Sequence, residues 1–297
     1  MAPRFWTIKP LLDVTADYLA SKGIDSPRLN AELLLAHHLR CRRLDLYLRF
    51  DQPLKEDELA GYRELVRRRT RREPLQYIRG RQEFWSLDFE VSEGVLIPRP
   101  ETERLVERAL SALETGPSGS SDHVQRILDL GTGSGILAVV LARERKKARV
   151  YASDVSPKAL SVARRNADQH GVADRIVFVE GDLFQPFRAT PVEPFALIVS
   201  NPPYVAEETF KTLVPEVRDY EPREALDGGR DGMRFVTPIL QESPAFLVPG
   251  GWLLVEMDPG QIEKARATAD ETAAYHAAEV IQDYSGRPRV LCVQKKV

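Results

Sequence analysis

The sequence predicts an α/β protein with a mostly parallel sheet and a small all-helical domain at its N-terminus. Two observations predict this fold class. From residue 126 onward, strand-like runs alternate with helical segments, which is typical of parallel strands joined by helical crossovers. Before residue 73, apolar residues recur at helical spacing and no strand pattern interrupts them.

Glycine and proline divide the N-terminal region into several short helices. Gly23 is typical of a helix end, and Ser26-Pro27 predicts an N-cap followed by proline at the first helical position. Residues 55–72 predict a charged amphipathic helix. The apolar positions expected on the helices are Leu11, Leu12, Tyr18, Leu19, Leu29, Leu33, Leu34, Leu35, Leu44, Leu46, Tyr47 and Leu48.

Charge is unevenly distributed along the 297 residues. Residues 1–80 hold 16 Lys and Arg against 11 Asp and Glu, a net charge of +5, whereas the rest of the chain carries −7. Much of the basic excess is one run, made up of Arg67, Arg68, Arg69, Arg71 and Arg72. The run is interpreted either as the solvated C-terminal end of a helix or as a docking patch for an acidic or RNA-associated partner. The near-neutral chain as a whole argues against a protein whose main ligand is nucleic acid.

Several classes of protein are excluded by the same composition. The longest apolar run, residues 136–142, is far shorter than the roughly 20 residues of a membrane span, and the first ten residues lack the apolar core of a signal peptide. The two cysteines, Cys41 and Cys292, provide neither a disulfide framework nor a cysteine-rich metal site. We therefore expect a cytoplasmic protein with no membrane partner and no metal.

The C-terminal region predicts seven strands. The last two are joined by a turn at residues 284–288 that has no room for a helix, so they should be antiparallel. Upstream, residues 82–91 predict a short hairpin or connecting strands, and residues 116–123 predict a loop. The seven expected strands are residues 126–130, 149–154, 175–180, 196–200, 251–257, 278–283 and 289–294.

A glycine-rich turn follows the first of these strands and opens a helix. Its sequence is Gly131-Thr132-Gly133-Ser134-Gly135. Glycines at this place let the backbone approach a ligand closely at a helix N-terminus. Because Ile136 occupies the third glycine position of a dinucleotide fingerprint, the pattern argues against NAD.

Asp154 ends the next strand. A carboxylate at this place can accept hydrogen bonds from both hydroxyl groups of a ribose. The same side chain can instead cap the helix that begins near Ser156-Pro157, and the two roles are compatible. The glycine-rich turn and a strand-end acid together favour a cofactor that contains a nucleoside.

Asn201-Pro202-Pro203-Tyr204 follows the buried strand at residues 196–200. Consecutive prolines give a rigid extended backbone without amide donors. The free acceptors are the Asn201 side-chain oxygen and backbone carbonyls such as that of Pro202, which can hold a planar NH2 group while Tyr204 stacks on it. At the carboxyl edge of a parallel sheet, this corner predicts a binding site rather than a simple turn.

These motifs resemble those of class I S-adenosylmethionine-dependent methyltransferases that act on amide or amine nitrogen. Further blocks resemble the PrmC/HemK family, the peptide chain release factor glutamine methyltransferases, over nearly the whole chain. Those blocks are Pro74-Leu75-Gln76-Tyr77-Ile78-Arg79-Gly80, Glu83-Phe84-Trp85, residues 94–103 (GVLIPRPETE), Glu221-Pro222, residues 225–229 (ALDGG) and Asp231-Gly232.

The resemblance implies a fold, a reaction and a set of site residues. The fold is a seven-stranded sheet with helices on both faces. The reaction is methylation, by S-adenosylmethionine, of the side-chain amide of the GGQ-motif glutamine in bacterial class I release factors, leaving S-adenosylhomocysteine. Asn201 to Tyr204 would hold the glutamine, and the implied cofactor-binding residues are Gly131, Thr132, Gly133, Ser134, Gly135, Asp154, Asp182, Leu183 and Asn201.

The implied domains are residues 1–72 for substrate recognition, 73–95 as a hairpin and linker, and 96–297 as the methyltransferase domain. Three alternatives stay open. One is glutamine methylation of a ribosomal protein, and a second is adenine-N6 methylation of DNA, whose exocyclic amine is also a planar NH2 group. The DNA enzyme needs a basic recognition surface, which the acidic C-terminal region does not favour, so we expect no direct nucleic-acid substrate. The third is a cofactor-binding module without catalysis.

Overall fold

The structure is a computed structural model that describes residues 6–115 and 124–297. The chain folds as two compact units. The first comprises Met1–Gly80 together with Val214–Tyr220, and the second comprises Arg81–Leu213 with Glu221–Val297. Residues 116–123, predicted as a loop, lie outside the described residues.

The first unit is helical, as predicted. Leu12, Leu19, Leu34, Leu35 and Tyr62 are fully buried in its core. Its helices are α1 (Ile8–Ser21), α2 (Pro27–His38), α3 (Arg43–Leu48), α4 (Glu56–Thr70), α5 (Leu75–Arg79) and α11 (Pro215–Arg218).

The start of α2 differs from the prediction in one detail. Ser26 does occupy the N-cap position, and Pro27 is the first helical residue. However, Ser26 has a left-handed backbone with φ of +47°, and its side chain makes no capping hydrogen bond. Instead, the Asn30 side-chain NH2 group donates to the backbone oxygens of Asp25 and Ser26.

Several apolar positions of the predicted stripes are exposed rather than buried. Leu44 and Leu48 on α3 are 61% and 75% exposed, and Tyr47 beside them is 42% exposed. Tyr18 on α1 and Leu29 on α2 are also exposed. Helical spacing alone did not reveal this, because α3 buries only Leu46 against its neighbours.

The basic run at the end of α4 is largely paired within the helical unit. Arg69 is buried, and its Nη2 lies 3.0 Å from Glu216 Oε1, while Arg72 Nη1 lies 3.1 Å from the same oxygen. The Tyr220 hydroxyl donates to the backbone oxygen of Arg71 at 2.6 Å. Arg67, Arg68 and Arg69 form the last turn of α4, as the helix-end interpretation expects, and the side chains of Arg69 and Arg72 also anchor residues 214–220.

The second unit contains the predicted seven-stranded sheet. Its strand order is β5-β4-β3-β6-β7-β9-β8. The five strands from β5 to β7 are parallel, and β9 runs antiparallel to both β7 and β8, as expected for the last two strands. The strands are β3 (Arg126–Leu130), β4 (Arg149–Asp154), β5 (Ile176–Glu180), β6 (Phe195–Ser200), β7 (Leu247–Glu256), β8 (Glu279–Gln282) and β9 (Pro288–Gln294).

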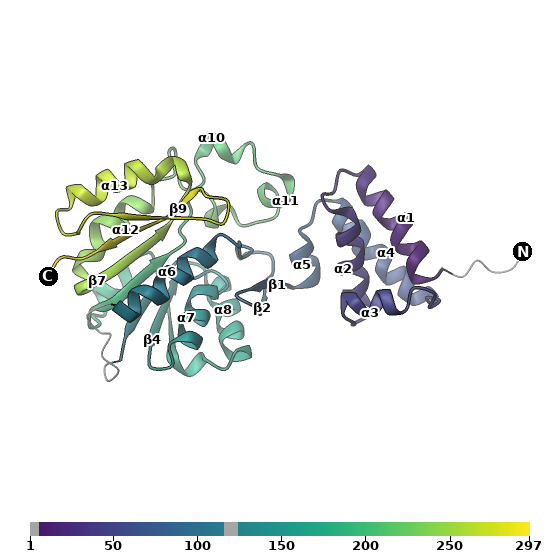
Figure 1. Ribbon diagram of the computed structural model, residues 1–297, viewed down its shortest axis with the longest axis horizontal. Helices are drawn as coiled ribbons and strands as arrows, with labels where there is room; N and C mark the ends of the chain where they lie inside the picture. The colour runs from purple at the N-terminus through teal and green to yellow at the C-terminus, as the bar shows by residue number, and fades with distance from the viewer. Residues whose placement is uncertain (1–5, 116–123) are drawn as a thin grey trace, which may run out of the picture. The chain divides into compact units, whose positions relative to one another are not determined.

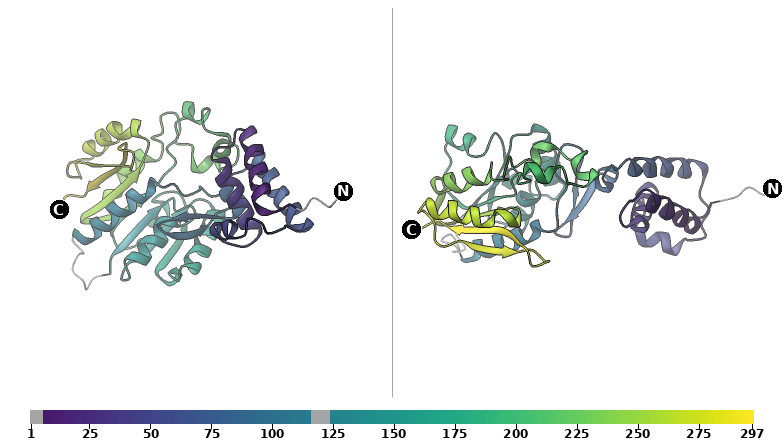
Figure 2. Two further views of the ribbon diagram at one scale, coloured as in Figure 1. Left: turned by 45° about the vertical axis from the view of Figure 1, so that its right-hand side comes forward. Right: turned by 90° about the horizontal axis from the view of Figure 1, so that it is seen from above.

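Helices cover both faces of this sheet (Figure 1). Adjacent residues of a strand point to opposite faces, so Ile127 belongs to the core beneath α6, α7 and α8, whereas Leu128 belongs to the core beneath α12 and α13. Figure 2 shows the sheet and the helices that cover its two faces from two further directions. The helices of this unit are α6 (Thr102–Thr115), α7 (Ile136–Glu144), α8 (Pro157–Gln169), α9 (Gln185–Ala189), α10 (Glu207–Phe210), α12 (Val236–Glu242) and α13 (Ile262–Glu271).

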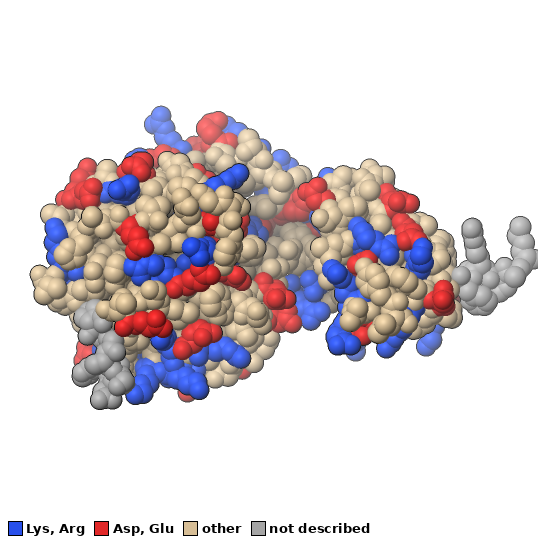
Figure 3. Space-filling view, in the orientation of Figure 1, with Lys and Arg blue, Asp and Glu red and all other residues tan. Residues whose placement is uncertain are grey.

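The aromatic-rich segment before the sheet forms the predicted hairpin. Its strands β1 (Arg81–Phe84) and β2 (Leu87–Glu90) pair antiparallel, and Phe89 is fully buried in the core beneath α6 to α8. Lys and Arg side chains alternate with Asp and Glu over the face of the second unit that Figure 3 shows. In residues 6–115 and 124–297, no helix has both the length and the apolar character needed to cross a membrane.

Candidate active site

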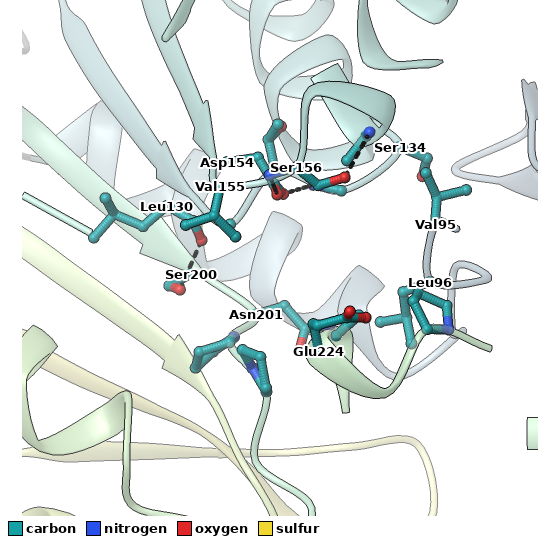
Figure 4. A pocket seen from close by; sticks show the side chains of 18 of the residues that line it. Val95, Leu96, Leu130, Ser134, Asp154, Val155, Ser156, Ser200, Asn201 and Glu224 are labelled. Carbon is teal, nitrogen blue, oxygen red and sulfur yellow. Dashed lines mark hydrogen bonds between the residues drawn. The ribbon is translucent and has the colours of Figure 1, made fainter. Parts of the chain in front are cut away.

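A cavity of about 520 Å³ opens at the carboxyl ends of the parallel strands in the second unit (Figure 4). It lies where the strand order reverses, because β3 has β4 on one side and β6 on the other. This is the usual ligand site of an open parallel sheet. Residues from the loops after β3, β4, β5 and β6 line the cavity, together with residues 94–96 and 98–99 and part of residues 222–235.

The glycine-rich turn after β3 forms one wall. Gly131, Gly133 and Gly135 all have left-handed backbones, with φ of +72°, +55° and +83°. A Cβ at Gly131 or Gly133 would meet no atom within 4 Å, so their bare backbone leaves open space beside the turn. Gly135 does not line the cavity; a Cβ there would come 2.9 Å from the Ala163 Cβ, so this glycine allows α7 to approach α8 closely.

Asp129 holds this turn from within the core. Its Oδ2 accepts hydrogen bonds from the Thr132 hydroxyl at 2.6 Å and from the Ala138 backbone N–H at 3.1 Å. Complete burial raises the pKa of Asp129 to about 7, although both hydrogen bonds oppose the change. Asp129 thereby joins the turn to the first helical residues of α7.

Asp154, at the end of β4, joins the glycine-rich turn to the next loop. Its Oδ2 accepts from the Gly133 N–H at 2.9 Å, and its Oδ1 accepts from the Ser156 N–H at 2.9 Å. The N-cap of α8 is Ser156, whose hydroxyl accepts from the Ala159 N–H, so Asp154 does not perform that role. Burial raises the pKa of Asp154, against three backbone hydrogen bonds.

The loop after β5 supplies a further wall. Asp182 and Leu183 both line the cavity, as do Thr132 and Ser134 of the glycine-rich turn. Leu183 has a left-handed backbone with φ of +43°. The leucine gives this wall of the cavity an aliphatic surface.

The corner after β6 lies opposite the glycine-rich turn. Asn201, Pro202 and Pro203 line the cavity, whereas Tyr204 does not. The Tyr204 hydroxyl donates to Glu256 Oε1 at 3.3 Å, and burial raises the pKa of this phenol. The structure thus directs the Tyr204 side chain toward Glu256, which differs from the stacking role expected from the sequence.

Glycines behind this corner explain two of the blocks noted in the sequence. Val205 N–H donates to the Leu226 oxygen, and Gly228 N–H donates back to the Val205 oxygen, at 2.8 and 2.9 Å. A Cβ at Gly228 would lie 2.7 Å from the Tyr204 Cα, and one at Gly232 would overlap the Tyr204 carbonyl oxygen. Only glycine fits so close to the Asn201–Tyr204 backbone.

The sequence alone assigned no role to Glu221, and the structure indicates one. Its carboxylate is buried; Oε2 accepts from the Ile97 N–H at 3.0 Å and Oε1 from Arg99 Nη2 at 2.5 Å. Pro98 and Arg99 line the cavity, so Glu221 positions this stretch. The sequence contains both Glu221-Pro222 and residues 97–100, within blocks noted above. Nothing in the sequence shows that these two segments contact each other.

Charged and hydrogen-bonding side chains line the cavity. No lining residue that the structure describes is His or Cys. The polar side chains that line it are the carboxylates of Asp154, Asp182 and Glu224, the hydroxyls of Thr132, Ser134, Ser156 and Ser200, the cations of Arg99 and Lys158, and the Asn201 amide. Such a site binds and orients a ligand and is suited to direct transfer between two bound molecules.

Comparison with known proteins agrees with this geometry. Residues 11–80 match the family described as PrmC N-terminal domain, and residues 108–217 match the methyltransferase small domain. The crystal structure of a methyltransferase from Pyrococcus furiosus has a similar fold, with a TM-score of 0.50 at 21% identity. The match covers 72% of this chain and 91% of the Pyrococcus chain.

Relatives of similar length identify the family within the methyltransferases. Proteins named release factor glutamine methyltransferase from Geobacter sulfurreducens, Chlorobaculum tepidum and Rhodopirellula baltica are 46%, 44% and 38% identical to this chain. Each match covers 97 or 98% of this chain and 97% of the relative. The chain is therefore a methyltransferase that belongs to the release factor glutamine methyltransferase family.

Proposed function

We propose that this protein transfers a methyl group from S-adenosylmethionine to the side-chain amide nitrogen of the GGQ glutamine in bacterial class I release factors. One observation carries the proposal: the Asn201 amide lines the same cavity as Asp154 and the glycine-rich turn. An acceptor for a planar NH2 group and a cradle for a nucleoside thus share one cavity. The names of the relatives support the choice of substrate.

The residues present fit S-adenosylmethionine. The open space at Gly131 and Gly133 leaves room for a ligand against the backbone. The two oxygens of Asp154 offer about four lone-pair sites, and three backbone hydrogen bonds leave one of them for a ribose hydroxyl. When bound, this cofactor supplies a methyl group activated by a sulfonium centre.

The task of the chain is then to orient a poor nucleophile. The lone pair of an amide nitrogen is delocalised into the carbonyl group, so the NH2 group must be held and turned toward the methyl group. Asn201 Oδ1 and the Pro202 carbonyl are the acceptors proposed to do this. Orientation of this kind supplies up to roughly 7–11 kcal/mol of a reaction barrier, and no lining His or Cys is needed as a base or nucleophile.

We further propose that the helical unit recognises the body of the release factor. A single side chain in a cavity buries too little surface to select one protein. Leu44, Tyr47 and Leu48 form an exposed apolar face on α3, which is suited to a protein partner. Since release factors act in translation, we also place the protein in the cytoplasm.

The test is methyl transfer from labelled S-adenosylmethionine to a purified release factor. A release factor with the GGQ glutamine replaced, a ribosomal protein fraction and duplex DNA are assayed beside it. Label on the intact factor alone is the expected result. Label on a ribosomal protein or on DNA would reassign the substrate, and cofactor binding without any transfer would indicate a binding module.

A further inference from the structure

Two fully buried polar residues lie behind the Asn201 corner. Thr102 is the first residue of α6, and Glu256 is the last residue of β7, the strand next to β6. Both side chains are 0% exposed. Neither lines the cavity, so neither can touch a molecule bound there.

Hydrogen bonds connect these residues to both polar side chains of the corner. Asn201 Nδ2 donates to Thr102 Oγ1 at 3.2 Å, and the Tyr204 hydroxyl donates to Glu256 Oε1 at 3.3 Å. The Thr102 hydroxyl also favours the charged form of the Glu256 carboxyl group, whose Oε2 is buried and has no hydrogen-bond partner among the described residues. Thr102 thus contacts Asn201, Glu256 contacts Tyr204, and the unpartnered Glu256 Oε2 is available to accept the Thr102 proton.

The carboxyl group at its centre is costly to bury. Burial raises the pKa of Glu256 to about 7, and Glu101 adds to the increase. Thr102, Arg289 and Tyr204 act in the opposite direction and favour the charged form. An apolar residue would fill the same position without this cost. We therefore infer that the carboxylate is present to accept hydrogen bonds from its neighbours.

The Glu256 carboxylate determines whether the Thr102 hydroxyl group donates to Asn201 or accepts from it. A hydroxyl has one proton to donate and can also accept, so Thr102 alone could face either end of an amide. In its charged form, which Thr102, Arg289 and Tyr204 favour, the Glu256 carboxylate can only accept. With the Thr102 proton directed to Glu256, the Thr102 oxygen is left as an acceptor, and only the NH2 end of Asn201 can face it.

The two ends of the Asn201 amide are nearly equal in size, so packing alone does not select between them. With Nδ2 held by Thr102, the opposite end, Oδ1, is the one available to the cavity that Asn201 lines. The reversed amide would place an NH2 group against the NH2 group of the substrate. Two donors would then face each other, and the acceptor that orients the substrate would be lost.

We propose that Thr102 and Glu256 are positioning residues that hold the Asn201 amide with its oxygen toward the substrate NH2 group. The inference rests on the proposed function for the identity of that substrate. The orientation of Asn201 itself is a property of the free protein and does not depend on the substrate.

The first test measures turnover. Thr102→Val keeps the shape of the side chain without its hydroxyl, Thr102→Ser keeps the hydroxyl, and Glu256→Gln removes the obligate acceptor. Loss of one oriented buried hydrogen bond predicts a kcat lower by about 10- to 100-fold in Thr102→Val and Glu256→Gln. Thr102→Ser should be at least about 10-fold faster than Thr102→Val, and the affinity for S-adenosylmethionine should stay within about two-fold.

Thr268→Val is the matched control, because it removes a mostly buried threonine hydroxyl from α13, where Thr268 Oγ1 donates to the Lys264 oxygen. Its kcat should equal that of the unaltered protein. The double variant of Thr102→Val and Glu256→Gln should be no slower than the slower single variant, because both act through one chain of contacts. Normal kcat in both single variants, or losses of Tm and cofactor affinity that match the loss of kcat, would overturn the inference.

The second test needs no substrate. In ¹⁵N-labelled protein, the side-chain NH2 resonance of Asn201, identified by its loss in Asn201→Asp, should move in Thr102→Val and Glu256→Gln but not in Thr268→Val. An unchanged resonance in both would contradict the proposed orientation. Absence of methyl transfer by the unaltered protein would instead count against the proposed function, and the resonance would still decide the role of Thr102 and Glu256.

Discussion

Asp154 Oδ2 accepts a hydrogen bond from the backbone N–H of Gly133 at 2.9 Å. The contact joins the end of β4 to the turn after β3, two segments that are 21 residues apart in the chain. One carboxylate therefore shapes the glycine-rich turn and at the same time faces the cavity that the turn lines. Binding of the cofactor and rigidity of its cradle depend on the same side chain.

Asp154→Asn should weaken binding of S-adenosylmethionine by about 10- to 100-fold, since hydrogen bonds to a charged group contribute about 1.5–3 kcal/mol. Isothermal titration calorimetry measures the effect. Asp168→Asn, at an exposed position of α8, is the control and should bind normally. Equal affinities for Asp154→Asn and the unaltered protein would exclude Asp154 from the cofactor site.

Gly133→Ala and Gly135→Ala should have different effects. Both substitutions strain a left-handed backbone, at a cost of about 1 kcal/mol. Only Gly135→Ala also forces a Cβ to within 2.9 Å of Ala163, so it should lower the Tm of the free protein more. Gly133→Ala should mainly weaken cofactor binding, because its Cβ points into open space. Thermal unfolding and calorimetry of each variant test this, and equal losses of Tm would contradict it.

Asn201→Ala should reduce kcat far more than cofactor affinity. The substitution removes the side-chain acceptor for the substrate NH2 group, and one oriented hydrogen bond contributes about 1–3 kcal/mol to the barrier. Single-turnover methyl transfer to a release factor, with calorimetry for the cofactor, separates the two quantities. Equal reductions in both would show that Asn201 acts as a cofactor ligand and not as a substrate ligand.

Substitutions on the exposed face of α3 should impair methylation of the whole release factor but not methylation of a short peptide that contains only its GGQ segment. Replacement of Leu44 and Leu48 by serine removes apolar surface that is 61% and 75% exposed, so stability should change little. We expect a KM for the intact factor that is higher by about 10-fold, with unchanged kcat/KM for a short GGQ peptide. Val124→Ser, at an exposed position of the second unit, is the control. Unchanged KM would remove α3 from the recognition surface.

The contribution of Asp129 to the free energy of unfolding should fall as pH rises from about 4 to about 7. The pKa of Asp129 is 3.8 in the unfolded chain and about 7 in the folded one, so between these values only the folded protein keeps the proton. Each pH unit in that interval costs up to about 1.4 kcal/mol of stability for this one group. Urea unfolding at pH 5 and pH 8 should show a smaller difference for Asp129→Asn, where Glu256 still contributes. Equal differences would show that the carboxyl group of Asp129 is not protonated in the fold.

The sequence alone was sufficient to predict the local structure and the ligand-facing turns. Alternating runs indicated the strands, because buried parallel strands need apolar residues and crossovers need helices. The glycine-rich turn, Asp154 and Asn201 to Pro203 were identified because each lies at the end of a strand, and parallel strands bring their carboxyl ends to one edge. The predictions for these residues used the local sequence pattern and this general rule for parallel sheets.

Tertiary structure decided everything that depends on which distant side chains meet. Glu256 contacts Tyr204 across 52 positions, Thr102 contacts Asn201 across 99, and Glu221 contacts Ile97 across 124. Residues 214–220 join the helical unit through Arg69 and Arg72, although no periodicity marks them. Periodicity reports which face of an element is apolar, whereas the partner of a buried polar group is set by the packing of whole elements. That packing directs Tyr204 toward Glu256 and holds Asn201 at the cavity.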